Sequence, residues 1–137
     1  MALEIRRIDS YSITVADQVA DGAKLLSRLA AGGVDLLAFQ ATPASPQGAR
    51  FTLCPIDGPT MTAAARRAGL HLDGPRPALW IKGSEEPGAL AGIYERLSRA
   101  GVRVRESSGI AHIDRGYGVV LYVEREDGAR AVAALQE

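Results

Sequence analysis

Apolar and polar residues follow two different periods along the chain, and each change of period marks the end of a predicted element. Residues 11–16 alternate and carry β-branched side chains, which predicts a strand. From about 20 to 32 the apolar and small residues recur at helical spacing, and Gly33 ends the helix. The elements predicted for the first half are a strand at 11–16, a helix at about 20–32, strands at 34–42 and 49–56, a short helix at about 59–68, and a brief strand at 70–72.

The second half gives the same order of periods but stops one strand earlier. Its predicted elements are a strand at 78–83, a helix at about 87–100, strands at 102–111 and 117–125, and a last helix at about 126–136. Asp73–Pro77 is the predicted linker between the halves. An open sheet edge invites unwanted pairing, so another segment has to cover it. Leu3–Ile8 is a candidate, because the first strand looks longer than its counterpart in the second half.

The two halves also repeat each other in sequence when one is shifted by 68 positions. The shift needs no gap and keeps the same register through a strand, a helix and two more strands. The matched positions are Ile13 with Ile81, Ala23 with Ala91, Arg28-Leu29 with Arg96-Leu97, Gly33-Val34 with Gly101-Val102, and Leu53 with Leu121. Since these positions also share a predicted structural role, we interpret the repeat as an internal duplication.

This element order predicts an α+β fold of two ferredoxin-like βαββαβ units in tandem. Each unit would be an antiparallel sheet with its helices on one face. The expected units are residues 1–73 and residues 77–137, the second lacking its own fourth strand. A unit of about 60 residues is marginally stable alone. Its free sheet face and edges favour pairing between the halves and between whole chains, so a homodimer is expected.

Composition narrows the classes of function. The 137 residues include 16 basic and 16 acidic side chains, and a nucleic-acid partner would call for a positive excess. The apolar runs are too short for a membrane span, and no secretion signal precedes the first strand. The single cysteine, Cys54, cannot form an internal disulfide. The expectation is a cytoplasmic protein with neither a nucleic-acid nor a membrane partner.

Catalytic and cofactor motifs are scarce. The two histidines are His71 and His112, and each lies at strand spacing from an aspartate, Asp73 and Asp114 respectively. Two such pairs are too sparse to indicate hydrolytic or metal chemistry. Gly32-Gly33 ends a helix instead of opening one, so it does not resemble a phosphate-binding loop. The sequence therefore predicts a protein that is not an enzyme and that holds no metal or cofactor.

Three segments carry a resemblance to a known family. They are the turn Glu85-Glu86-Pro87-Gly88-Ala89-Leu90, the helix end Ala100-Gly101-Val102, and the alternating strand Gly118–Val123. In this pattern the chain resembles the ACT domain, a small regulatory module attached to many enzymes of amino-acid metabolism. The tandem layout is similar to that of ACT-domain proteins without a catalytic domain.

The resemblance implies a ligand site at the turn between the first strand and first helix of each unit. The residues at these turns are Asp17, Gln18, Val19 and Ala20 in the first half and Ser84, Glu85, Glu86, Pro87, Gly88, Ala89 and Leu90 in the second. Physical chemistry favours the same place, since the first amides of a helix lack backbone partners and carry partial positive charge. They can receive a carboxylate, and Gly88 lets a ligand approach the backbone.

Two alternatives remain open from the residues. The acidic side chains Asp17, Glu85 and Glu86 could bind an ammonium group of a ligand, or they could cap the helices with no ligand at all. The first half also lacks the proline and glycine of the second turn. The predicted function is a regulatory module that binds a small metabolite, an amino acid by resemblance. The alternative is an interaction module that dimerises without a ligand.

Overall fold

The chain is α+β, and its elements follow the predicted order closely. The computed structural model describes residues 3–84, 86–112 and 116–136. The elements are β1 (Leu3–Val15), α1 (Gln18–Ala31), β2 (Leu36–Pro43), β3 (Ala49–Pro55), α2 (Gly58–Ala68), β4 (Asp73–Gly83), α3 (Ala89–Arg99), β5 (Val104–Ala111), β6 (Tyr117–Val123), a 3-10 turn η1 (Arg125–Asp127) and α4 (Gly128–Leu135). No helix within these described ranges has the length and apolar character needed to cross a bilayer.

The contacts divide the chain into two compact units. Asp9–Arg76 forms one, here called the continuous unit, and Met1–Ile8 with Pro77–Glu137 forms the other, the discontinuous unit. The expected division had placed residues 1–73 together. The first eight residues instead group with the second half, because Leu3 and Ile5 pack against its apolar core.

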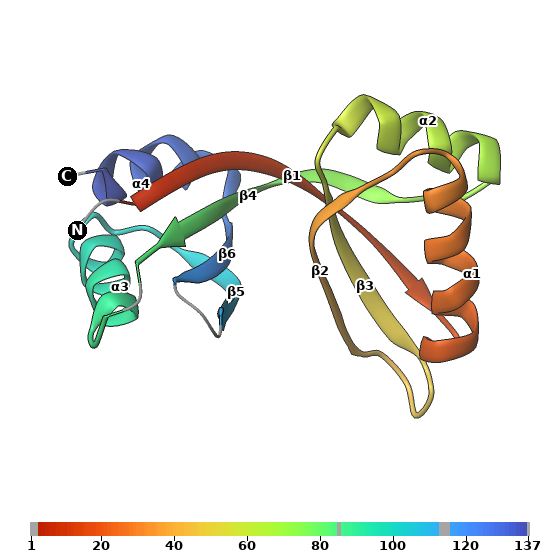
Figure 1. The fold of residues 1–137 in the computed structure, drawn as a ribbon, viewed down its shortest axis with the longest axis horizontal. Coiled ribbons are helices and arrows are strands. Elements are labelled where there is room, and N and C mark those ends of the chain that lie inside the picture. The colour runs from red at the N-terminus through yellow and green to blue at the C-terminus, as the bar shows by residue number, and fades with distance from the viewer. Residues whose placement is uncertain (1–2, 85, 113–115, 137) are drawn as a thin grey trace. The chain divides into compact units, whose positions relative to one another are not determined.

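In the continuous unit the strand order is β2-β3-β1-β4, and α1 and α2 lie on the same face of β1, β2 and β3 (Figure 1). Alternate strand residues point at the helices, as the period of two requires. The core contains Tyr11, Leu25, Leu29, Ala49, Phe51, Leu53, Met61 and Ala64. The second helix begins and ends as its sequence predicts, with Pro59 in the first turn and Gly69 at φ 70° after the last.

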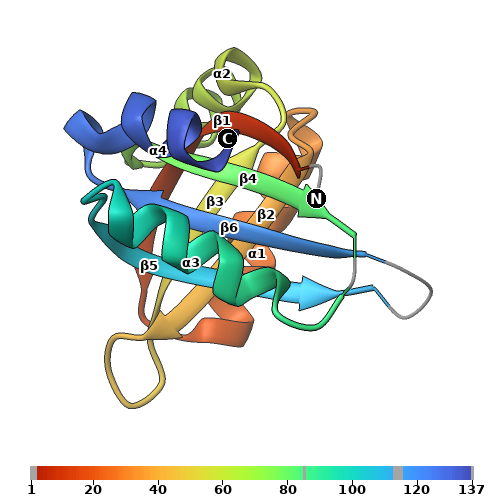
Figure 2. The same ribbon diagram turned by 90° about the vertical axis from the view of Figure 1, so that its left-hand side faces the viewer.

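In the discontinuous unit the strand order is β1-β4-β6-β5, with α3 and α4 across one face (Figure 2). Leu3–Ile8, the segment offered by the sequence as a cover for the open edge, runs beside β4. The core of the discontinuous unit contains Leu79, Ile81, Ile93, Leu97, Val119, Leu121, Val123, Ala131 and Leu135. None of the described strands pairs with the outer edge of β5, and nearly all of β5 is exposed.

The strand pairings of the two units coincide under the same offset of 68 positions that relates their sequences. The equivalent pairs are Ile13–Phe51 and Ile81–Val119, and a break in register falls at Leu36/Ala38 and again at Val104/Glu106. Gly33 and Gly101 end the equivalent helices at φ 84° and 68°. A shared register is stronger evidence of a repeat than similar residues are. A slip of one residue in the pairing would move every side chain of the strand to the opposite face of the sheet.

The predicted linker and the predicted strand before it were wrong. Residues 70–72 are not part of a strand, whereas Asp73–Pro77, expected to be a linker, is the first part of β4. Two prolines are tolerated here because β6 pairs only with residues 78–83 of β4. Among the described strands, β6 does not pair with residues 73–77, so this part of β4 has a strand on one side, and proline is accepted on such an edge.

Candidate ligand-binding site

The start of α1 is capped by the chain itself. Asp17 Oδ1 accepts hydrogen bonds from the amides of Val19 and Ala20 at 3.1 and 2.9 Å. The Gln18 amide donates to the Gln47 carbonyl at 2.8 Å, and the Asp17 amide donates to Asp21 at 2.9 Å. The amides that a ligand carboxylate would need are therefore already engaged, so at this turn the acidic residues act as caps.

The start of α3 differs, because no described side chain caps it. Ser84 and Glu86 are exposed, Pro87 lies in a turn before the helix, and Gly88 takes the N-cap position at φ 82°. The predicted helix start at residue 87 was therefore two residues early, since a left-handed glycine cannot continue a helix backward. Glu85, the remaining predicted residue of this turn, lies outside the described residues.

The first amides of α3 lie at a helix start that no described side chain caps. The Ala89 amide donates to the Glu86 carbonyl at 3.2 Å, and the Gly92 amide closes the first turn on Gly88 at 2.9 Å. Between them, the amides of Leu90 and Ala91 belong to the group that has no partner within a helix. This end of α3 therefore carries partial positive charge.

A cavity of about 460 Å³ opens beside this helix start, entirely within the discontinuous unit. Three elements and the turn line it, with Glu86, Ala89, Leu90 and Tyr94 from the turn and α3, Ser107, Ser108, Gly109, Ile110 and Ala111 from β5, and Tyr117, Gly118 and Val119 from β6. Leu90 and Ile110 are 54% and 79% exposed. The cavity thus joins an apolar surface to a polar end, as small-molecule sites commonly do.

Tyr117 is the most unusual group of this cavity. Its hydroxyl oxygen is buried and has no hydrogen-bond partner among the described residues. Burial first, and then the negative charge of Glu86, raise the pKa of Tyr117, so the hydroxyl keeps its proton. Gly83, paired with Tyr117 across β4 and β6, makes room for the ring, since a Cβ there would lie 2.4 Å from the hydroxyl. A buried donor without an acceptor is costly unless something else binds it.

The other tyrosine of the cavity is already engaged. Tyr94 Oη and Ser107 Oγ lie 2.5 Å apart and share a hydrogen bond. This contact ties α3 to β5 and fixes one wall of the cavity. Sequence reasoning had assigned neither Tyr94 nor Tyr117 to the ligand site, because a tyrosine in a strand or on a helix face gives no local sign of where its hydroxyl will lie.

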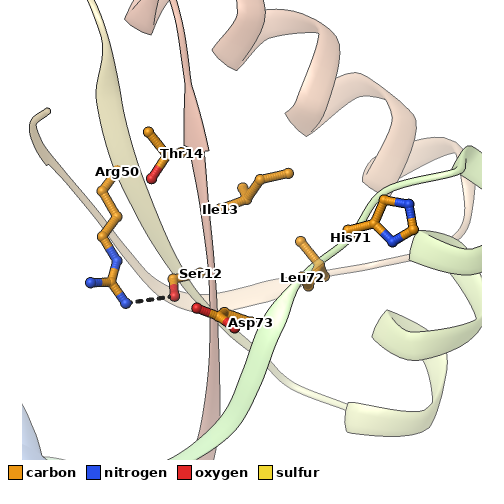
Figure 3. A pocket seen from close by; sticks show the side chains of 7 residues that line it. All are labelled: Ser12, Ile13, Thr14, Arg50, His71, Leu72 and Asp73. Carbon is orange, nitrogen blue, oxygen red and sulfur yellow. Dashed lines mark hydrogen bonds between the residues drawn. The ribbon is translucent and has the colours of Figure 1, made fainter. Parts of the chain in front are cut away.

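A second cavity, of about 450 Å³, lies within the continuous unit (Figure 3). It is lined by Ser12, Ile13, Thr14, Arg50, His71, Leu72 and Asp73. Arg50 donates from a terminal nitrogen to Ser12 Oγ at 2.8 Å. Arg50 and Asp73 lie on one side of the cavity and His71 on the other (Figure 3). His71 and Asp73 are therefore separated across the cavity instead of forming the pair that their spacing allowed.

The described residues contain no cluster of metal-binding side chains. Across residues 3–84, 86–112 and 116–136, no three histidine, cysteine, aspartate or glutamate side chains lie close enough together to hold a metal ion. Asp114, at strand spacing from His112 in the sequence, lies outside the described residues. The cysteine, Cys54, is buried in β3.

Comparison with known proteins yields matches among solved structures. No protein-family model and no curated protein matches the chain. Protein BT0572 from Bacteroides thetaiotaomicron matches with a TM-score of 0.80 and 18% identity, over 96% of this chain and 88% of that one. The regulatory subunit of aspartate kinase from Thermus thermophilus matches with a TM-score of 0.70 and 14% identity, over 98% and 95% of the two chains. The corresponding subunit from Thermus flavus gives 0.63 and 16%, over 98% and 93%.

The chain has the fold of aspartate kinase regulatory subunits. At these identities the likeness concerns the fold alone, and it supports the ACT-like α+β architecture predicted from the sequence. The two aspartate kinase structures are of regulatory subunits, and they match this chain over nearly its whole length. What such a fold binds has to be argued from the side chains of this protein.

Proposed function

We propose that this protein is a regulatory module of two ACT-like units in tandem that binds an amino acid at the start of α3. The observation that carries the proposal is the cavity of about 460 Å³. It brings together a helix start and the buried hydroxyl of Tyr117, and within the described part of the chain neither a capping side chain nor a partner for the hydroxyl is found. The shared strand registers of the two units support the tandem description. The likeness to regulatory subunits of aspartate kinase supports the regulatory role.

Each part of an amino acid finds a complementary group in this cavity. The amides of Leu90 and Ala91 receive the carboxylate at the positive end of α3. Glu86, which lines the same cavity, attracts the ammonium group. The Tyr117 hydroxyl donates to a ligand oxygen, and Leu90 and Ile110 cover an apolar side chain. The α1 start is not part of this proposal, because its amides are bonded to Asp17 and Gln47.

Tyr117→Phe tests the proposal, because it removes one hydroxyl and keeps the ring. Ligand affinity is expected to fall roughly tenfold, the value of one lost hydrogen bond. The unliganded variant is expected to be as stable as the wild type, since the hydroxyl has no hydrogen-bond partner to lose among the described residues. The measurement is isothermal titration calorimetry with each of the twenty amino acids, followed by thermal unfolding of the variant without ligand.

Two control variants separate binding from stability. Asp17→Ala removes the cap of α1 and is expected to lower stability by about 1 kcal/mol without changing ligand affinity. Tyr94→Phe removes a hydroxyl that Ser107 already engages and is expected to change affinity less than Tyr117→Phe. If none of the amino acids binds at millimolar concentration, or if Asp17→Ala alone abolishes binding, the proposed site is wrong.

A second function, dimerisation without a ligand, is favoured by the β5 edge. This strand ends the sheet of the discontinuous unit, and Ile110 on it is 79% exposed. An exposed strand edge is a template for pairing with another chain. Under this alternative the protein is a dimer at micromolar concentration by light scattering, and Ile110→Lys converts it to a monomer. A wild-type monomer that still binds amino acids would rule the alternative out.

A further inference from the structure

We propose that the cavity of the continuous unit is a second binding site, for a small aminocarboxylate held between Arg50 and Asp73. This site shares no lining residue with the cavity beside α3. Its volume, about 450 Å³, lies in the range of sites for small metabolites. Its lining carries one basic and one acidic side chain on the same side (Figure 3).

Arg50 is a cation whose guanidinium has N–H groups that no described residue accepts from. It sits on β3 directly opposite Thr14 of β1, so both side chains stand on the same sheet face. The guanidinium is half-buried, and of its five N–H groups one is directed at Ser12, at 2.8 Å. The remaining donors form the planar fork that suits a carboxylate. The Arg50–Ser12 bond also fixes the direction of the fork, because Ser12 is itself buried at 5% exposure.

Asp73 supplies the opposite charge at the first position of β4. The ion pairs found among the described residues include neither Asp73 nor Arg50. Two opposite charges thus line one cavity without forming an ion pair with each other. A molecule with a carboxylate at one end and an ammonium group at the other can satisfy both of them.

A ligand with a single charge is disfavoured by the same arrangement. An anion bound to Arg50 meets the repulsion of Asp73, and a cation bound to Asp73 meets that of Arg50. The Ser12 hydroxyl accepts from Arg50 and still has its own proton to donate to a carboxylate. The geometry therefore favours molecules that carry both charges. The separation between the carboxylate and the ammonium group is then the property that distinguishes one such ligand from another.

The test uses the full chain labelled with 15N and four probes: glycine, γ-aminobutyrate, acetate and methylammonium. An aminocarboxylate is expected to shift the amide resonances of Ser12, Thr14 and Asp73. Acetate and methylammonium are expected to bind at least tenfold more weakly. Arg50→Gln and Asp73→Asn are each expected to weaken aminocarboxylate binding at least tenfold, whereas Arg66→Gln, an exposed arginine of α2, leaves it unchanged.

The outcomes separate this site from the one at α3. If only the amides of Leu90 and Ala91 shift, the site between Arg50 and Asp73 is wrong and the site beside α3 stands. If only the amides of Ser12, Thr14 and Asp73 shift, the site beside α3 is wrong and the site between Arg50 and Asp73 stands. The proposal is also wrong if acetate binds as tightly as glycine and Asp73→Asn leaves the binding of glycine unchanged. If Arg50→Gln does not fold, Arg50→Lys keeps the charge and is expected to weaken binding less, since it loses only the fork geometry.

Discussion

Replacing Asp127 with alanine is expected to lower the thermal unfolding midpoint by roughly 5–10 °C at neutral pH. The Asp127 side chain is fully buried at the start of α4. Its Oδ2 accepts from the Arg103 amide at 3.0 Å and from Arg103 Nε at 3.1 Å, and its Oδ1 accepts from Arg130. The alanine variant leaves the Arg103 amide without its acceptor and removes one acceptor from each of the two guanidinium groups, which keep their contacts to Glu126 and to the Ala100 carbonyl. It also releases α4 from the segment that leads into β5.

The same residue predicts a loss of stability in acid. The hydrogen bond from the Arg103 amide, then that from the Arg103 side chain, lower the pKa of Asp127 below its ordinary 3.8. A carboxyl group with a lower pKa in the folded state stabilises the protein above its unfolded pKa, and that contribution is lost as the pH falls toward the folded value. The wild type should therefore lose stability below about pH 4 more steeply than Asp127→Asn.

Thermal unfolding at neutral pH measures the first effect, and urea unfolding between pH 2 and pH 7 measures the second, both followed by circular dichroism. Asp35→Asn is the matched control, because Asp35 is exposed and has no side-chain partner among the described residues. It should change neither the midpoint nor the acid limb appreciably. Equal behaviour of Asp127→Ala and Asp35→Asn would mean that the Arg103 and Arg130 contacts contribute nothing measurable.

Gly83→Ala is expected to reduce amino-acid affinity at least tenfold and to lower the free energy of unfolding by about 1–3 kcal/mol. A Cβ at this position would lie 2.4 Å from the Tyr117 hydroxyl and 2.6 Å from the ring carbon that carries it. These separations are far inside van der Waals contact, so the ring has to move. The hydroxyl then leaves its place at the wall of the cavity beside α3.

Gly58→Ala is the control for this substitution, because Gly58 lies at the start of α2 and does not line the cavity beside α3. A Cβ at Gly58 would meet its nearest atom, the Tyr11 hydroxyl oxygen, at 3.5 Å, which is an ordinary van der Waals contact. It should fold and bind like the wild type, and calorimetry of both variants provides the comparison. Unchanged affinity in Gly83→Ala, in a variant shown to be folded, would remove Tyr117 from the proposed site.

The position of Tyr117 illustrates where prediction from sequence ends. The alternating strand that contains it was predicted at residues 117–125, close to the observed Tyr117–Val123. That its hydroxyl is buried depends on Gly83, which is 34 positions away and becomes its neighbour only when β4 pairs with β6. Arg50 and Asp73 are likewise brought to one cavity by the pairing of β3, β1 and β4, with no motif joining them in the sequence.

The sequence by itself determined the kinds and order of the elements, the offset of 68 positions and the turn that opens α3, because period, capping residues and glycines act over a few neighbours. The sequence offered Leu3–Ile8 only as a candidate to cover the second half, and the tertiary structure decided that β1 and β4 each run through both units. It also decided which helix start is capped, since the α1 amides bond to the Asp17 side chain and the Gln47 carbonyl, whereas no described side chain caps α3. Pairing and burial are properties of distant segments, and no local pattern encodes them.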